Sequence, residues 1–374
     1  MNIKNGRDNF FVNFLIFIIY AFYLLAYSIR SVYNVHSYLS VIIICIVYLY
    51  ILFLTNNNEK YKSNLLIIAL VVIHIAFGAG FSSFGLGASL NVLNMFLFVF
   101  IVDKVTLSKK VVVAMKIFTP IMYALFFISN HSFLNPNYVG FIYLLYFMLF
   151  NNLFNLSKKN LFSFILSAIL ALITIHFGNV YQCRTSQIIT IFIFVIEHLP
   201  FNKNFIKSDF LKKILPYVFT IGSLICTYVY VYMWKNDISI DLTTFATKRL
   251  YSGRNAIWYE CYNLIKEHPL FGVGSNYTIH SHLTYALHNS MMMIVTTFGI
   301  PCILLFIYSL RKLIYELYTK FSKYKNFYLI IVGLCCIFFV DYFESYFYWS
   351  LYNFIEFIII LLAIYRVNGE KNEK

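Results

Sequence analysis

Long apolar runs separated by short polar breaks cover almost the entire chain. Most runs hold about 17 to 21 residues, enough to cross a hydrocarbon core of about 30 Å as a helix. Backbone groups have no water partner in lipid, so runs of this length must be helical. The pattern predicts an all-α, polytopic membrane helix bundle with about twelve transmembrane helices. The predicted helices cover residues 10–29, 38–54, 64–80, 86–102, 111–129, 138–154, 161–178, 186–201, 214–233, 290–310, 327–343 and 347–365.

Composition also indicates a membrane protein. Hydrophobic residues make up 61% of the 374 residues and charged residues only 12%, whereas soluble domains carry about 25% charged residues. Lys and Arg number 29 against 15 Asp and Glu, which gives a net charge of +14. A basic excess is also typical of nucleic-acid binding, so its distribution along the chain decides what it means.

Most of the Lys and Arg fall in alternate breaks between the apolar runs. Placing those breaks in the cytoplasm satisfies the positive-inside rule loop by loop and puts both termini on that side. The basic excess therefore reports topology and requires no nucleic-acid partner. The run from Phe10 follows Lys4 and Arg7, but no cleavage site follows it, so we interpret it as the first spanning helix. Residues 1–374 are predicted to form one transmembrane domain with one large outer loop, 234–289, between the ninth and tenth helices.

Basic residues on the predicted outer side are candidates for function because topology does not require them. Two lie in short outer turns, Arg30 and Arg184, and the remainder lie in the large loop: Lys235, Lys248, Arg249, Arg254 and Lys266.

The large loop contains a predicted helix that begins near Ser252, a plausible N-cap, and ends before Pro269. One apolar face carries Ile257, Trp258, Cys261, Leu264 and Ile265, at the spacing of an amphipathic helix. Arg254 falls in the first turn. A helix N-terminus combined with a guanidinium suits a phosphate oxygen.

Two further residues lie where the chain enters a helix from outside. Arg184 precedes the eighth helix, with Thr185 or Ser186 able to cap it. His288 precedes the tenth, where the helix dipole favours a neutral imidazole that can accept a proton. Taken alone, the arginine is equally explained by contact with headgroups, and the histidine by a structural role. Their shared position at outer helix ends favours one site.

Other polar residues leave alternatives open. His280 and His282 with His288 lack a carboxylate or thiol at ligand spacing, so we predict no metal site. Asp341 and Glu344, in the last outer turn, either bind sugar hydroxyls or are solvated. Glu356, within the last helix, is functional by default, but a buried pair with Lys116 or a hydrogen bond explains it equally well.

The order of these features resembles the O-antigen ligase and polysaccharide polymerase (Wzy-like) superfamily of bacterial membrane proteins. The matching features are an outward Arg184, a late loop with Ser252-Gly253-Arg254 and the His268–Gly274 segment, and His288-Asn289 at a helix start. A family motif of His, then Asn, Ser or Gln, two free positions, Leu, six free positions and Gly reads here from His288 to Gly299. Met292 stands in place of the Leu.

A second short segment of the family, Asn-Pro-Asn followed by Gly, is matched by Asn135-Pro136-Asn137 and Gly140. The resemblance extends over the whole chain in topology and over about 252–299 in motifs. It implies a GT-C-like membrane glycosyltransferase that transfers glycans from a polyprenyl pyrophosphate carrier, without metal or other cofactor.

The resemblance also implies roles for individual residues. His288 is expected to be the base that deprotonates the acceptor sugar, and Arg184 and Arg254 to hold the departing pyrophosphate. Asn289, Arg249 and His282 are expected to support them.

The favoured interpretation is a polymerase of undecaprenyl-pyrophosphate-linked repeat units of a capsular or similar polysaccharide. It would be a multi-pass protein of the bacterial cytoplasmic membrane with an outward-facing site. A flippase and a chain-length regulator are expected partners beside the membrane lipid. The alternatives are a ligase of the same superfamily and, in a different class, a flippase or transporter of lipid-linked sugars.

Overall fold

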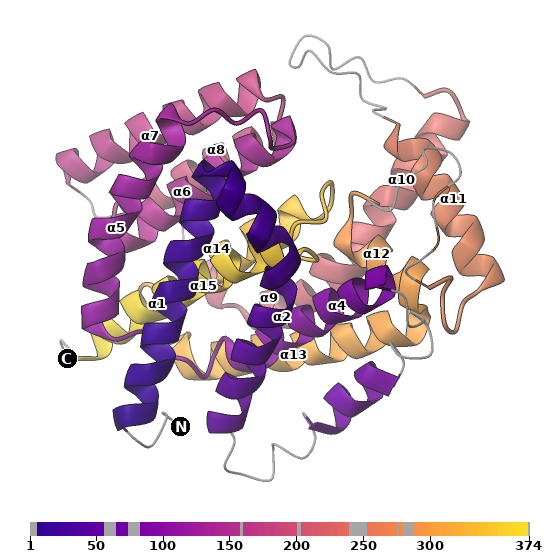
Figure 1. Ribbon diagram of the computed structural model, residues 1–374, viewed down its shortest axis with the longest axis horizontal. Helices are drawn as coiled ribbons and strands as arrows, with labels where there is room; N and C mark the ends of the chain where they lie inside the picture. Colours follow the sequence, from indigo (N-terminus) through magenta and orange to yellow (C-terminus); the bar gives the residue numbers. More distant parts are fainter. Residues whose placement is uncertain are drawn as a thin grey trace.

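The structure is a computed structural model, described for residues 6–55, 65–73, 83–157, 160–199, 203–238, 253–274, 277, 279 and 287–372. Nearly all of these residues lie in helices, as the apolar runs predict (Figure 1). The elements are α1 (Gly6–Ser28), α2 (Arg30–Leu54), α4 (Ser83–Ile101), α5 (Lys109–Ile128), α6 (Pro136–Phe154), α7 (Leu161–Val180), α8 (Arg184–His198), η1 (Lys203–Lys207), α9 (Asp209–Tyr217), η2 (Val218–Gly222), α10 (Ser223–Lys235), α11 (Arg254–Glu267), α12 (Ser290–Phe298), α13 (Ile300–Phe321), α14 (Phe327–Val340) and α15 (Ser350–Asn372).

Among the described residues, six helical stretches are long and apolar enough to cross a membrane. Shorter apolar helices also occur, at Leu39–Leu54, Gly87–Ile101 and Phe327–Val340. The all-helical class is confirmed, and the apolar helices indicate a membrane protein. The six stretches are Phe10–Ser28, Lys109–Ile128, Pro136–Phe154, Leu161–Val180, Asp209–Lys235 and Tyr352–Gly369.

Large apolar side chains face outward on the helices at the edge of the molecule. Ile117, Ile121 and Ile128 on α5 are exposed, as are Phe162 and Leu172 on α7. Soluble proteins rarely expose extended apolar faces of this kind. In a bilayer these side chains would contact acyl chains and would not be exposed to water, which agrees with the apolar composition of the sequence.

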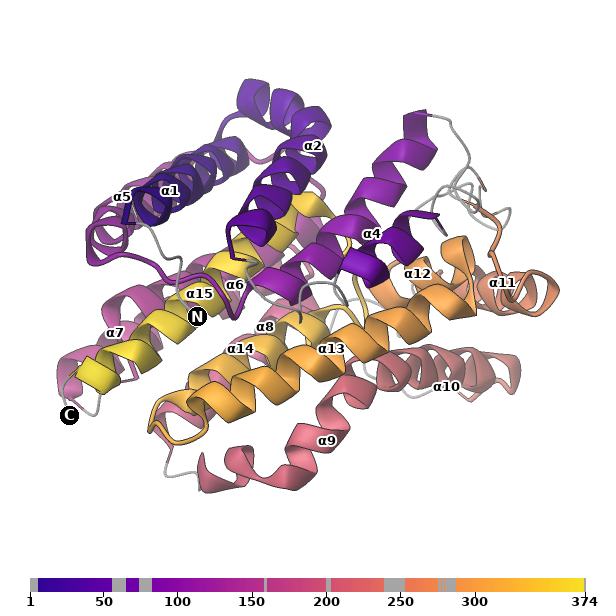
Figure 2. The same ribbon diagram turned by 90° about the horizontal axis from the view of Figure 1, so that it is seen from below.

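The helix α15 lies at the centre of the bundle. It contacts α1, α2, α4, α6 and α14, and its side chains from Tyr352 to Ile364 are all buried. Figure 2 shows it crossing the middle of the bundle, with α14 beside it. The turn 341–349 that leads into α15 is therefore anchored to the core at both ends, by α14 and α15.

The predicted single helix 290–310 is wrong in one respect: it is broken into α12 and α13 at Gly299. Gly299 has φ +84°, a conformation that L side chains rarely adopt. A Cβ at this position would lie 2.3 Å from the Leu270 carbonyl oxygen. Glycine therefore allows the segment before α12 to pack directly against the break.

The predicted helix 214–233 is present as one helical stretch from Asp209 to Lys235. It consists of α9, the π-helical turn η2 and α10. Pro216 lies just before η2 and cannot donate a helical hydrogen bond. The Tyr342 hydroxyl donates to the Val218 carbonyl that the π turn exposes. The turn 341–349 is thereby fixed against this helix.

The predicted helix in the large loop is confirmed as α11, which ends at Glu267, two residues before Pro269. Ile257, Trp258, Cys261 and Leu264 are buried, as their spacing predicts. The helix packs against α10 and α12, so its first turn is held beside the start of α12.

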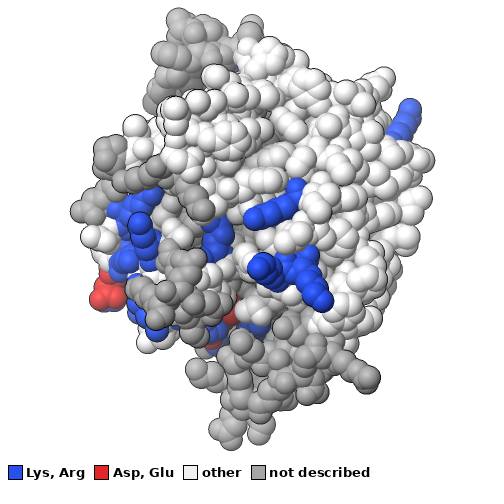
Figure 3. Space-filling model, turned by 90° about the vertical axis from the view of Figure 1, so that its left-hand side faces the viewer, with Lys and Arg blue, Asp and Glu red and all other residues white. Residues whose placement is uncertain are grey.

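Charged side chains gather on the side of the molecule where α1 begins and α15 ends. Figure 3 views this side and shows Lys and Arg side chains grouped on it, with few Asp or Glu and a broad uncharged surface beside them. A basic surface is expected at the cytoplasmic face of a membrane protein.

Candidate functional site

Three separate segments meet at one buried carboxylate, Glu344, in the turn 341–349. One Glu344 oxygen accepts a hydrogen bond from Arg254, the first residue of α11. The other lies 3.2 Å from Nδ1 of His288, just before α12. The Glu344 side chain is only 6% exposed, against 16% for Arg254 and 34% for His288. The imidazole is thus the part of the cluster that opens to its surroundings.

The charge of Glu344 is fixed by its two partners. Burial raises the pKa of this carboxyl, but the Arg254 guanidinium and the His288 imidazole lower it by more, so its net pKa lies below the ordinary value. Glu344 is therefore ionised at neutral pH. An ionised carboxylate at Nδ1 favours the tautomer in which Nδ1 carries the proton and Nε2 is an acceptor.

The backbone presents His288 in an uncommon conformation. His288 has φ +53°, in the left-handed region that non-glycine residues visit only when their surroundings hold them there. The Trp258 indole N–H donates to the Leu287 carbonyl oxygen at 2.7 Å, and Trp258 is fully buried. This contact ties α11 to the residue immediately before His288.

Asn289 holds the other side of His288. Its side-chain oxygen caps α12 by accepting from the Met292 N–H at 2.8 Å. Its amide nitrogen donates to Ser223 Oγ at 2.8 Å and to the Tyr342 carbonyl oxygen at 3.0 Å. Asn289 is fully buried, so its support of His288 is structural: it locks α10, α12 and the turn 341–349 together.

The turn that carries Glu344 is itself held from within. Asp341 Oδ1 accepts from the Phe347 N–H at 3.0 Å, and Ser290 Oγ accepts from the Tyr348 N–H at 3.1 Å. Glu344 is therefore positioned by the same residues that begin α12. The cluster of Arg254, Glu344 and His288 is called the Glu344 cluster below.

The segment His268–Gly274 packs on the end of α12. The N–H groups of Val273 and Gly274 donate to the carbonyl oxygens of Thr296 and Thr297, at 3.0 and 3.1 Å. A Cβ on Gly272 would lie 2.5 Å from Thr296 O. The glycines of this segment thus allow two backbones to meet at van der Waals distance.

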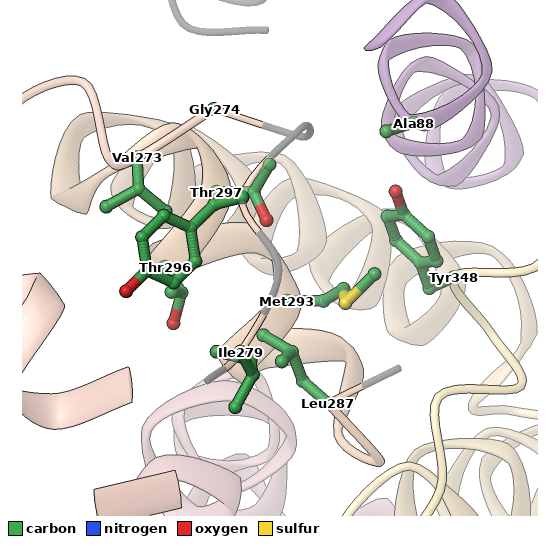
Figure 4. A pocket seen from close by; sticks show the side chains of 10 residues that line it. Ala88, Val273, Gly274, Ile279, Leu287, Met293, Thr296, Thr297 and Tyr348 are labelled. Atoms are coloured by element: carbon green, nitrogen blue, oxygen red, sulfur yellow. The ribbon is translucent and has the colours of Figure 1, made fainter. Parts of the chain in front are cut away.

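A pocket lies beside the Glu344 cluster, between this segment, α12 and the turn 341–349. Its polar lining includes the hydroxyl-bearing side chains Tyr277, Thr296, Thr297 and Tyr348. Met293 points toward Tyr348 across it (Figure 4). Leu287, the neighbour of His288, also lines the pocket, whose volume of about 20 Å³ is enough for roughly one water molecule.

No family model, no curated protein and no solved structure matches this chain.

Arg184 begins α8, as predicted, but the cap predicted there is wrong. No side chain caps this helix start in the described structure; instead Ser186 Oγ donates to the Gly140 carbonyl oxygen at 2.9 Å. A Cβ on Gly140 would lie 2.5 Å from Cys183 Cβ, so glycine permits α6 and the start of α8 to touch. The Glu344 cluster, as the described residues define it, does not include Arg184.

The Asn135-Pro136-Asn137 segment has a local explanation. Asn135 caps α6 by accepting from the Asn137 N–H at 3.0 Å, and Pro136 occupies the first turn, where its missing N–H costs nothing. This segment and Gly140 set the position of α6 against α8.

The predicted supporting residues Arg249 and His282 lie outside the described residues, as does Ser252, the predicted N-cap of α11. Gly253 precedes α11 with φ +85°. Within the described part of the chain, no group of three His, Cys, Asp or Glu side chains is arranged to hold a metal ion.

Glu344, the central residue of the cluster, was not predicted as such from the sequence. Asp341 and Glu344 were predicted to bind sugar hydroxyls or to be solvated; solvation is wrong, since both are buried. The sequence did carry a signal for Glu344. A carboxylate in an apolar turn needs a cation nearby, and Arg254 was already predicted to lie on the same side of the membrane.

The predicted pairing of Glu356 with Lys116 is also wrong. Glu356 is fully buried, whereas Lys116 is exposed. Neither Glu356 oxygen has a hydrogen-bond partner among the described residues.

Proposed function

We propose that this chain is a membrane polymerase that joins polyprenyl-pyrophosphate-linked oligosaccharide repeat units on the outer face of the bacterial cytoplasmic membrane. The observation that carries the proposal is the Glu344 cluster: one buried carboxylate holds an imidazole on one oxygen and a guanidinium on the other. A base and an anion-binding group are thereby held on the two oxygens of one carboxylate.

His288 is the base in this proposal. With its Nδ1–H donating to Glu344, Nε2 is free to take the proton of an acceptor sugar hydroxyl as that oxygen attacks the anomeric carbon of the donor. General-base help of this kind is worth about 10²–10⁴ in rate. The partly exposed ring is reachable, while its orientation is fixed by a buried partner.

Arg254 stabilises the leaving group. As the bond between the anomeric carbon and the pyrophosphate oxygen breaks, its electron pair stays on that oxygen, where negative charge grows. A guanidinium has five N–H donors, so Arg254 can bind a phosphate oxygen while it remains paired with Glu344. Charge stabilisation by a preorganised group is the main source of catalysis in such reactions. Arg184, at the start of α8, is proposed as the second pyrophosphate ligand.

Attack by the acceptor hydroxyl from the face opposite the pyrophosphate would invert the anomeric centre.

The proposal includes the topology that the sequence predicts: about twelve transmembrane helices, both termini cytoplasmic and the Glu344 cluster outside, in a GT-C-like arrangement. Alternate Lys and Arg-rich breaks support it. A reporter that works only in the cytoplasm should be active when it is fused after Lys374. A reporter that works only outside the cell should be active when it is inserted in 239–250.

The decisive experiment is a gel profile of lipid-linked and surface glycan from cells that lack the gene and are complemented with wild type, His288→Ala or His176→Ala. The control histidine is exposed on α7. We expect wild type and the control to restore polymer. The deletion and His288→Ala should leave single repeat units on an outward-facing carrier.

A ligase of the same superfamily would use the same chemistry on a different acceptor. In that case full-length polymer would accumulate on the lipid carrier of the deletion strain, and the polymerase proposal would be wrong.

Buried Glu356 favours a second candidate, a proton-coupled transporter of lipid-linked sugars. Intramembrane carboxylates often mark transport pathways, and this one has no hydrogen-bond partner within the described residues. Single units trapped facing the cytoplasm in the deletion strain, together with full activity of His288→Ala, would establish transport instead.

A further inference from the structure

A basic groove of about 350 Å³ lies between α9 and α13, away from the Glu344 cluster. Two basic residues come from each helix, Lys212 and Lys213 from α9 and Arg311 and Lys312 from α13, and the one carboxylate in the lining is Asp209. The lining is strongly positive for a groove of this size, and its charges come from helices that pack against each other.

Two tyrosines complete the groove, Tyr308 and Tyr315 of α13. The Lys212 ammonium lies 4.1 Å from the centre of the Tyr315 ring, a cation–π contact that holds the ammonium in the groove. Tyrosine places an apolar ring and a polar tip at the same depth, which suits the boundary between headgroups and acyl chains.

An exposed apolar face continues from the groove along α13. Leu304, Tyr308, Arg311 and Tyr315 are spaced by four, three and four residues, so they share one face of the helix. Leu304, Tyr308 and Tyr315 are each more than half exposed. A molecule with its anionic head in the groove would therefore find an apolar track for its chains.

Topology alone does not account for this arrangement. The positive-inside rule requires only that charge be present on the cytoplasmic side, and exposed Lys109 and Lys110 at the start of α5 satisfy it without a groove. In the groove, cations from two helices converge on one space with aromatic walls. Basic pockets between membrane helices on the cytoplasmic side are typical binding sites for anionic headgroups.

We propose that this groove binds the phosphate of an anionic membrane phospholipid, with the acyl chains lying along the exposed face of α13. Lys212, Lys213 and Arg311 would contact the phosphate, and the Tyr308 and Tyr315 rings would lie against the upper part of the chains. This proposal is independent of the polymerase proposal, since it uses none of the residues of the Glu344 cluster.

The test is native mass spectrometry of the purified full-length protein, delipidated and then titrated with phosphatidylglycerol or phosphatidylcholine. The variants are Lys213→Gln/Arg311→Gln, both exposed positions, and the control Lys109→Gln/Lys110→Gln, which removes the same charge from another surface. We expect wild type and the control to retain phosphatidylglycerol preferentially. The groove variant should bind it about tenfold more weakly.

Three results would overturn the proposal. Equal binding of the two lipids by wild type would exclude headgroup recognition. An equal loss of binding in the control and the groove variant would reduce the effect to general surface charge. Full displacement of the lipid by millimolar inorganic phosphate from wild type, but not from the groove variant, would make the groove a site for free phosphate. Equal elution of all variants on size-exclusion chromatography excludes misfolding as a cause.

Discussion

Among the described residues, two buried carboxylates are paired with cations from distant segments, and they differ in their surroundings. Asp103, at the end of α4, pairs with Lys320 of α13; the same ammonium lies 3.5 Å from Glu316. Glu344 pairs with Arg254 and His288. Both carboxylate side chains are nearly inaccessible, at 2% and 6% exposure.

The difference lies in the partners. Lys320 is a flexible ammonium, 38% exposed, on a regular helix and shared with a second carboxylate. Arg254 and His288 are planar groups at helix starts, held by Trp258, Asn289 and a left-handed backbone. One pair joins two helices; the other fixes the direction of a titratable ring. Of these two sites, the Glu344 cluster is therefore the one that suits the proposed role of a general base.

The largest effect should come from removing the imidazole. His288→Ala should reduce repeat-unit polymerisation by about 10²–10⁴, the usual contribution of a general base, and change the thermal stability little, since the ring is partly exposed. Initial rates with lipid-linked repeat units in detergent would measure this. An active His288→Ala enzyme would remove His288 from the mechanism.

Removing the carboxylates separates the two pairs by stability. Glu344→Ala leaves the Arg254 guanidinium partly buried without a partner, so we expect a loss of about 3–5 kcal/mol. Asp103→Ala should cost about 1 kcal/mol or less, because the Lys320 ammonium that remains is 38% exposed and still lies 3.5 Å from Glu316. Thermal unfolding of both variants in the same detergent would compare them. Equal losses of stability would show that the Glu344 and Asp103 pairs do not differ in this way.

Glycine at the break between α12 and α13 should matter as much as an ion pair. Gly299→Ala forces a side chain into a left-handed position against Leu270 O, which we expect to cost about 1–3 kcal/mol. Gly87→Ala is the matched control: its Cβ meets nothing within 4 Å, and alanine favours the helix by up to about 1 kcal/mol. The two substitutions should therefore shift the unfolding temperature in opposite directions. A shift in the same direction would show that the break tolerates a side chain.

The smallest predicted effect is a dependence of stability on pH. The folded pKa of Glu344 lies below its ordinary value of 4.5 because Arg254 and His288 outweigh burial. The stabilisation by its charge is therefore complete above about pH 4.5 and is lost as the pH falls through the lower folded pKa. The unfolding temperature of wild type should drop more steeply than that of Glu344→Gln in this range. Parallel curves would show that Glu344 is not ionised in the cluster.

The helices could be predicted from sequence because backbone groups in lipid must form their hydrogen bonds within the same segment. A long apolar run has no alternative to a helix in a membrane, and the amphipathic spacing of Ile257, Trp258, Cys261 and Leu264 identifies the buried face of α11. The break at Gly299 was missed because a single glycine in an apolar run reads as helix. Only the approach of Leu270 from the preceding segment makes its left-handed conformation necessary.

For the site, sequence identified His288 and Arg254 as residues at outer helix starts, and the structure joins both through Glu344. Glu344 was left with two alternatives, because its role depends on partners 56 and 90 residues away in the chain.

The sequence by itself determined that this is an all-helical membrane protein, where its apolar segments lie and which types of charged residue stand at their ends. These properties follow from the hydropathy of neighbouring residues, which acts over a single helix. Only the tertiary structure decided that the turn 341–349 supplies the carboxylate, that Asn289 joins α10, α12 and this turn, and that α9 and α13 form a basic groove. A buried charge is stable only where another segment brings the opposite charge to it, and packing of the whole bundle determines which segment that is.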